Sequence, residues 1–189
     1  IGPRVNAKKF ERVRTINGSG RPLFVPNATV GNDVRFDGVL PKVADFSPTD
    51  QWDEPYCALV RYLDKVKPEA LSQNSVLVDY TLFEKHAAEL RGQPVRVTGL
   101  VVHHSPLRLE GPTGDVEWIY RAYISSPSGE EGYIVDLLET PPPLGKHQLV
   151  SFDALFLKMA TYEGKGGTKR PPLLLGRQLR VVKESIPQE

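Results

Sequence analysis

The chain has 189 residues, of which 40% are hydrophobic and 25% charged, so it can form one packed domain and is not a wholly disordered protein. Its 24 basic and 23 acidic side chains give a net charge of +1, which argues against a surface that attracts nucleic acid or anionic lipid on every side. Cys57 is the only cysteine, which excludes an intrachain disulfide and a cysteine-built metal site. No apolar run reaches the roughly 18 residues that suggest a membrane span.

The beginning of the chain is basic. Residues 1–21 carry six basic side chains and one acidic one, and the first residue is Ile1 rather than Met. We interpret this start as the result of removing a signal or an anchor, although a cleaved expression tag would leave the same start. The basic leader is either a solvated segment, which we favour, or an arm beside a membrane or nucleic acid. Residues 21–51 predict irregular chain with one or two short strands packed over the domain.

Two helices are predicted before the first long strand. Apolar residues at spacings of three and four predict a helix over 54–66, with Asp53 at its N-cap. A second helix is predicted over 82–90, with Thr81 as the capping residue and Gly92 as its left-handed C-terminal cap. We therefore divide the chain into an N-terminal extension of two helices, 1–91, and a β domain, 92–184, which together form one compact unit.

The second half of the chain predicts five strands. Seventeen Pro and sixteen Gly indicate many turns, which suits short strands. The first strand is too long to be straight, and Gly99 and Pro106 are the two places where it could bend. Alternation in the second strand places Trp118 and Tyr120 on the core side. The predicted strands cover 95–109, 116–125, 133–138, 148–162 and 173–182.

Five strands with a long bent first strand, and a break between the third and fourth, predict a mainly β (α+β) fold: a five-stranded antiparallel OB-like barrel behind a two-helix collar. The run Arg91-Gly92-Gln93-Pro94-Val95-Arg96-Val97 resembles the entry into anticodon-binding-like OB domains. The later runs 156–162 and 170–175 resemble uncharacterised exported proteins of planctomycete-type bacteria. The resemblance covers 89–182 and implies a fold and an exported location, but no activity. The proline run 141–143 leaves no room for the helix that OB folds often have there.

No catalytic or metal-binding pattern is evident. His103 and His104 are adjacent in a strand and point to opposite faces, so they do not suit one metal ion. The glycine-rich stretch 164–169 lacks the following helix that a phosphate-binding loop needs. The expectation is a protein that is not an enzyme and has no catalytic residue, metal or cofactor.

Two functions remain. The main hypothesis is a non-catalytic binding or interaction module of the cell envelope, exported or membrane-anchored, with an unknown protein or polymeric ligand; a cytoplasmic location stays open. The alternative is a single-stranded nucleic-acid-binding OB domain, which the charge balance of the β domain does not favour because its eleven basic and ten acidic side chains leave only +1. The candidate ligand-binding residues are Arg108, Arg121, Tyr123, Lys165, Lys169 and Arg170.

Overall fold

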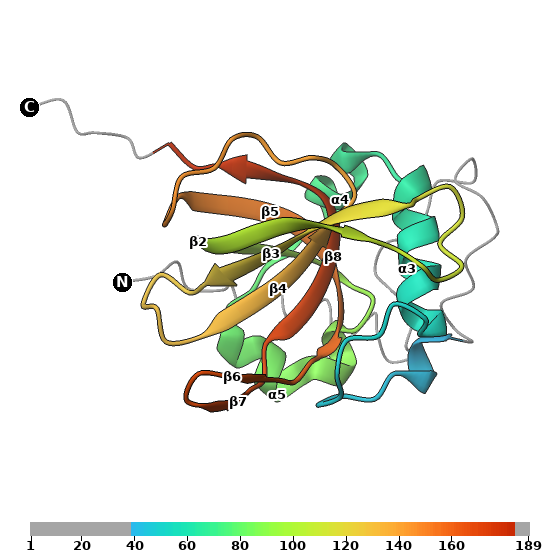
Figure 1. Ribbon diagram of the computed structural model, residues 1–189, viewed down its shortest axis with the longest axis horizontal. Coiled ribbons are helices and arrows are strands. Elements are labelled where there is room, and N and C mark those ends of the chain that lie inside the picture. Colours follow the sequence, from blue (N-terminus) through green and yellow to red (C-terminus); the bar gives the residue numbers. More distant parts are fainter. Residues whose placement is uncertain (1–38, 184–189) are drawn as a thin grey trace, which may run out of the picture.

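The computed structural model describes residues 39–183, in which three α-helices precede a β-barrel (Figure 1). After a short 3-10 turn, η2 (Leu40–Lys42), come α3 (Glu54–Lys65), α4 (Pro68–Asn74) and α5 (Tyr80–Leu90). The two predicted helices correspond to α3 and α5, whereas α4 was not predicted. Pro68 ends the first helix and also begins α4, because its missing N–H and fixed φ suit the first turn of a helix. The predictions for residues 1–21, and for 21–38 of the next segment, lie outside the described residues.

The barrel closes on itself. Its sheet has the order β2-β3-β4-β8-β5, and β5 pairs back with β2. A two-residue strand, β1, adds to β2 in parallel, and β6 and β7 form a separate hairpin. The strands are β1 (Val76–Leu77), β2 (Pro94–Arg108), β3 (Trp118–Ser125), β4 (Gly132–Leu137), β5 (Leu149–Met159), β6 (Tyr162–Gly164), β7 (Gly167–Lys169) and β8 (Pro172–Val181).

The prediction of a wholly antiparallel barrel is wrong, because β4 and β8 are parallel. The other four pairs around the barrel are antiparallel. The reason is parity. When an odd number of strands closes into a ring, alternating directions cannot return to the starting direction, so one neighbouring pair has to be parallel. The five-stranded closure and the strand order are those of an OB fold.

Local signals place the ends of α5. Its N-cap is Asp79, whose carboxylate accepts a hydrogen bond from the Leu82 amide at 3.0 Å, so the prediction of Thr81 as the cap is wrong. Both residues are good caps, but the helix begins at Tyr80, two residues before the start that the apolar pattern indicated. At the other end Gly92 has φ 74°, which confirms the predicted left-handed cap. A Cβ at Gly92 would lie 2.5 Å from Cδ1 of Leu40, so any other residue would displace the Leu40 side chain and would be strained by the positive φ.

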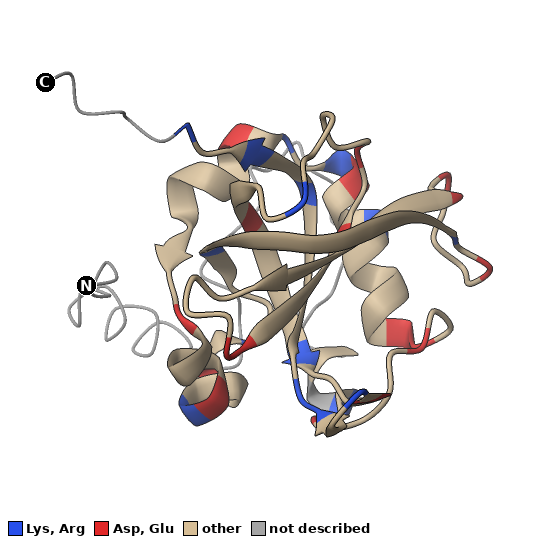
Figure 2. Ribbon diagram, turned by 60° about the vertical axis from the view of Figure 1, so that its left-hand side comes forward, with Lys and Arg blue, Asp and Glu red and all other residues tan. Residues whose placement is uncertain are grey.

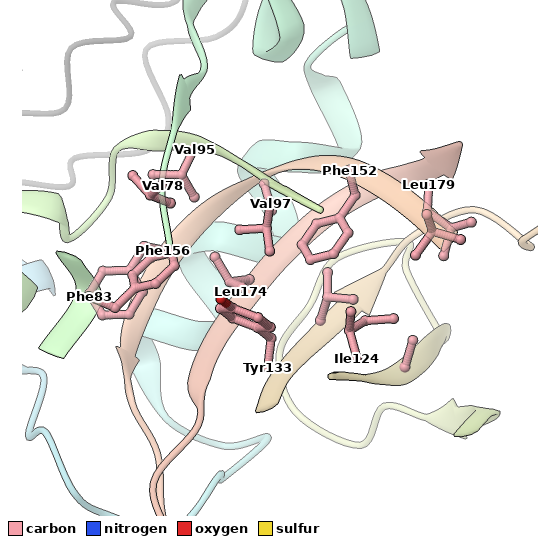
Figure 3. Close-up of a cluster of buried hydrophobic side chains, with 14 of the residues drawn as sticks. Val78, Phe83, Val95, Val97, Ile124, Tyr133, Phe152, Phe156, Leu174 and Leu179 are labelled. Atoms are coloured by element: carbon pink, nitrogen blue, oxygen red, sulfur yellow. The ribbon is translucent and has the colours of Figure 1, made fainter. Parts of the chain in front are cut away.

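Helix α5 closes one end of the barrel (Figure 1). Its Phe83 ring lies 4.9 Å from that of Phe156 on β5 and 6.2 Å from that of Tyr133 on β4. Figure 3 shows Phe83 and Phe156 together at one side of the barrel core, with Phe152 and Leu179 at the other. The connection from β4 to β5 contains no helix, as the prolines predicted. Helix α5 thus lies at the end where β4 begins and β5 ends, opposite the connection from β4 to β5, which lies at the end where β5 begins.

The long strand β2 changes face at a bulge. The register against β3 shifts between Val101 and His103, so the β-bulge falls at Val102. Beyond the Pro106–Tyr120 pair, where the pairing of β3 with β4 ends, β2 and β3 continue past the barrel as a two-stranded ribbon. Trp118 lies on this ribbon and is 51% exposed, so the prediction that its ring is core is wrong. The alternation predicted for β3 is correct, but Trp118 lies at the start of β3, before this strand joins the barrel.

A second core lies outside the barrel, under α3. Helix residues Tyr56, Leu59 and Leu63 are at most 1% exposed and pack with outward-facing residues of the strands, among them Ile119 and Ile134. The division into an extension, 1–91, and a β domain, 92–184, that form one compact unit stays a prediction. Within 39–183, no helix combines the length and the apolar character that a membrane crossing requires.

Candidate nucleic-acid interface

Helix α3 covers most of the surface on which OB folds usually bind their ligands. That surface is the outer face of the second and third barrel strands, here β3 and β4, together with the neighbouring loops. Ile119 on β3 is fully buried and Ile134 on β4 is 3% exposed, both in the core under α3. A ligand therefore has access only to the part of this face that α3 leaves open.

A buried ionic network fastens α3 over the strands. The Tyr56 hydroxyl donates to Oδ2 of Asp136 at 2.7 Å, and Arg121 donates to both oxygens of Asp136 at 2.8 and 2.7 Å. Burial opposes the charge of Arg121, but its hydrogen bonds and Coulombic attraction to Asp136 outweigh burial and raise its pKa. Arg121 was a candidate ligand-binding residue. Its side chain is 15% exposed and its guanidinium is engaged in this network.

Three rings form a row across the open part of the face, which we call the aromatic strip: His103, Tyr123 and Tyr162. His103 of β2 stacks against Tyr123 of β3, with ring centroids 6.3 Å apart and planes at 28°. Tyr162 of β6 meets Tyr123 edge-on at 6.2 Å. Tyr162 is 43% exposed and His103 is also exposed. The strip thus offers a continuous aromatic surface to solvent, with Tyr123 half-buried at its centre.

A basic hairpin borders the strip. It consists of β6, β7 and Arg170, and its cations are Lys165, Lys169 and Arg170. The positive φ values of Gly166 and Gly167, 94° and 103°, allow the tight turn. Tyr162 pairs with Lys169 in the ladder, which places the cations beside the strip. Among the described residues no carboxylate lies within ion-pair distance of these three cations. Figure 2 shows blue segments on this hairpin at the lower edge of the molecule.

Phe46 extends the surface beyond the hairpin. Its ring is 53% exposed, and the guanidinium carbon of Arg170 lies 5.3 Å from the ring centroid. Its backbone has φ 57°, a left-handed conformation that costs a non-glycine residue about 1–2 kcal/mol. Strained, exposed residues of this kind cluster at functional sites.

The structure brings together some of the candidate residues and separates others. Tyr123 contacts Tyr162, which pairs with Lys169 on the same hairpin as Lys165 and Arg170. Arg108 is not among them: it lies on the ribbon opposite Trp118, and alternation turns it to the side away from His103. Sequence reasoning missed Tyr162, His103 and Phe46 as members of this surface. Tyr162 was assigned to the end of a long strand, and no local signal could have told that the strand ends at Met159 and that the chain then folds back toward β3.

A cavity of about 390 Å³ lies near the N-terminus of α3, between residues 42–55 and β5. Its Lys158 ammonium is 4% exposed and donates to Oγ of Ser47 and to the Pro48 carbonyl, both at 2.8 Å. Burial lowers the pKa of Lys158, and the carboxylate of Asp53, 3.7 Å away, offsets part of that shift. We interpret Lys158 as a tie that holds the 45–53 segment on the barrel. Asp53 takes part in this tie and makes no side-chain cap for α3.

The search for metal ligands used the part of the chain that the structure describes. Within it, no group of three or more His, Cys, Asp or Glu side chains comes close enough to hold a metal ion. His103, which we had considered as a metal ligand from sequence, lies in the aromatic strip.

The sequence matches no protein-family model and no curated protein. Among solved structures, the OB domain of a Thermoplasma acidophilum protein aligns with 51% of this chain and 81% of its own, at 16% identity and a TM-score of 0.30. The mitochondrial single-stranded DNA-binding protein Rim1 of S. cerevisiae aligns with 48% of this chain and 94% of its own, at 14% identity and a TM-score of 0.33. Likeness this distant carries no functional argument, and the OB assignment rests on the strand order and closure described above. The resemblance to exported planctomycete-type proteins stays a prediction.

Proposed function

We propose that this protein binds single-stranded nucleic acid across the aromatic strip and the basic hairpin. One observation carries the proposal: three contacting rings lie beside three cations that have no ion-pair partner among the described residues. Aromatic rings next to a cationic backbone groove are the general means of holding an unpaired strand, because every base has a face that can stack.

The two halves of the surface have separate tasks. The exposed faces of Tyr162 and His103 would stack on unpaired bases. In a duplex the bases stack on one another and are not available to these rings. Lys165, Lys169 and Arg170 would contact phosphates. Three cations make only a small electrostatic contribution to the binding free energy. A domain of nearly neutral net charge can provide that contribution. The proposal replaces the cell-envelope module as our leading hypothesis.

Fluorescence anisotropy with labelled oligo(dT) and oligo(U) tests the proposal. We expect binding at low salt that weakens as salt rises. For three phosphate contacts on a single strand, the slope of log K against log salt should be about −2. A duplex of the same length should bind more weakly. No binding to any single strand at low salt would contradict the proposal.

Matched variants locate the interface. Tyr162→Ala should weaken binding about 5-fold or more, because stacking on one base contributes about 1–3 kcal/mol. Lys169→Ala should weaken binding and make the salt slope shallower by about 0.7. The controls are Trp118→Ala and Arg108→Ala, an exposed ring and an exposed cation on the ribbon, which should leave binding unchanged. If the control pair weakens binding instead, the ligand lies on the ribbon.

The location of the protein stays a separate proposal. Export or membrane anchoring rests on the resemblance of residues 89–182 to exported planctomycete-type proteins. Fractionation of cells that express the full-length protein tests it, and a purely cytosolic pool would contradict it.

A further inference from the structure

We propose that Phe46, presented by the segment before α3, is a further stacking site for an unpaired base, with Arg170 as its cationic partner. The inference rests on the proposed function and extends it, because it adds a part of the chain outside the barrel to the binding surface. OB folds bind through barrel strands and the loops between them, whereas Phe46 belongs to neither.

The segment around Phe46 is firmly held. Asp45 accepts a forked pair of hydrogen bonds from Arg91, at 3.1 and 2.6 Å, and another from the Met159 amide at 2.9 Å. The Phe46 amide donates to the Met159 carbonyl at 2.7 Å, and the Thr161 amide donates to the Ser47 carbonyl at 3.1 Å. Bonds on both sides of Phe46 thus fix its left-handed backbone against the end of β5.

The ring itself gains little from this arrangement. It is 53% exposed and belongs to neither hydrophobic cluster among the described residues. A residue such as Asn or Gly would adopt the same φ with less strain. The fold therefore holds an aromatic ring outward at a position where backbone preference and burial both argue against one, which is a reason to assign the ring to a ligand.

Arg170 joins this ring to the proposed interface. Its guanidinium lies over the Phe46 ring, and its carbonyl accepts a hydrogen bond from the Tyr80 hydroxyl at 2.9 Å, so its backbone is anchored to α5. The preceding residue, Lys169, pairs with Tyr162 of the aromatic strip. A strand that stacks on Tyr162 can thus continue to Phe46, where a base would take the place that the guanidinium now occupies and Arg170 would turn to a phosphate. Arginine planes and aromatic rings are the usual partners of unstacked bases.

Phe46→Gly tests the assignment, because glycine removes the ring and suits the backbone. We expect the Kd for labelled oligo(dT) to rise about 5-fold to 100-fold, the range that loss of one stacked base produces. The salt slope should stay that of the wild type, because no charge is lost. The melting temperature should stay level or rise, because the strain is relieved. Trp52→Ala is the control: that ring is 62% exposed and lies outside the strip, so its loss should change neither the Kd nor the melting temperature.

The outcomes separate the two proposals. If the wild type binds no single strand, the proposed function fails, and the role of Phe46 fails with it. If the wild type binds and Tyr162→Ala weakens binding while Phe46→Gly does not, only the present inference is overturned. A fall in melting temperature with unchanged affinity would also overturn it, because the ring would then serve the fold. Loss of affinity in Phe46→Gly, at wild-type melting temperature and salt slope, is the supporting result.

Discussion

The hydroxyl of Tyr56 on α3 donates a 2.7 Å hydrogen bond to Asp136 on β4, beneath a helix that covers the usual ligand face of an OB barrel. Asp136 is fully buried and also accepts two hydrogen bonds from Arg121. A buried carboxylate with an ionic partner and a phenol is costly to expose, so the helix is a fixed part of the fold. This contact keeps α3 over that face and leaves the aromatic strip as its open part.

Tyr56→Phe should lower the free energy of unfolding by about 1.5–3 kcal/mol, the range for a hydrogen bond to a charged group. The phenyl ring keeps the packing, so the loss reports the hydroxyl alone. Urea unfolding followed by circular dichroism measures it. Tyr162→Phe, at an exposed ring, should change the free energy by less than about 0.5 kcal/mol. Equal effects in both variants would contradict the ionic anchor.

Phe156→Ala should lower the free energy of unfolding by about 3–5 kcal/mol, because it deletes a buried ring from the barrel core. Phe156 is fully buried and its ring lies 4.9 Å from that of Phe83, so the cavity would open between β5 and α5. Thermal and urea unfolding measure the effect, and Trp52→Ala is the exposed aromatic control. A melting curve that does not move would mean that α5 does not close the barrel.

Asp79→Ala should lower the free energy of unfolding by about 1 kcal/mol, through loss of the cap on α5. Thr81→Ala, at the position that the sequence alone indicated, should have a smaller effect because the bond to the Leu82 amide comes from Asp79. Urea unfolding of the two variants side by side tells them apart. The reverse order would mean that the helix begins at Thr81 in solution.

Asp153 should make the protein sensitive to acid. Burial favours its protonation, but the hydrogen bond from Arg96 at 2.8 Å and the ion pair with Arg180 outweigh burial and lower its pKa. Because the folded pKa lies below the unfolded value of about 3.9, the carboxylate stabilises the fold above about pH 4 and loses this contribution as the pH falls through the folded pKa.

Arg180→Gln tests this dependence. Arg180 is 43% exposed, so the variant should fold. Because Nη2 of Arg180 lies 2.7 Å from Oδ2 of Asp153, the pKa of Asp153 should be lowered less in the variant than in the wild type. The free energy of unfolding, measured from pH 2 to pH 6, should then fall less steeply with acid than in the wild type. Parallel curves for the two proteins would show that Asp153 does not cause the acid dependence.

The sequence alone determined the elements of this protein and the outline of its barrel. Alternation and turn residues located the five barrel strands, the three-and-four spacing located α3 and α5, and Gly92 marked the end of α5. These signals are local, because each depends on residues within a few positions along the chain. An odd count of strands in a closed barrel also implies one parallel pair, but not that this pair is β4 and β8.

Only the tertiary structure decided which surface remains open. Arg121, Tyr123 and Ile119 share one face of β3. The sequence of that strand does not show that α3 covers Arg121 and Ile119 and leaves Tyr123 beside Tyr162. The same holds for Phe46 and Arg170, which are 124 positions apart and meet because both flank the end of β5. Contacts of this kind depend on how distant segments pack, and a pattern within one segment carries no information about that packing.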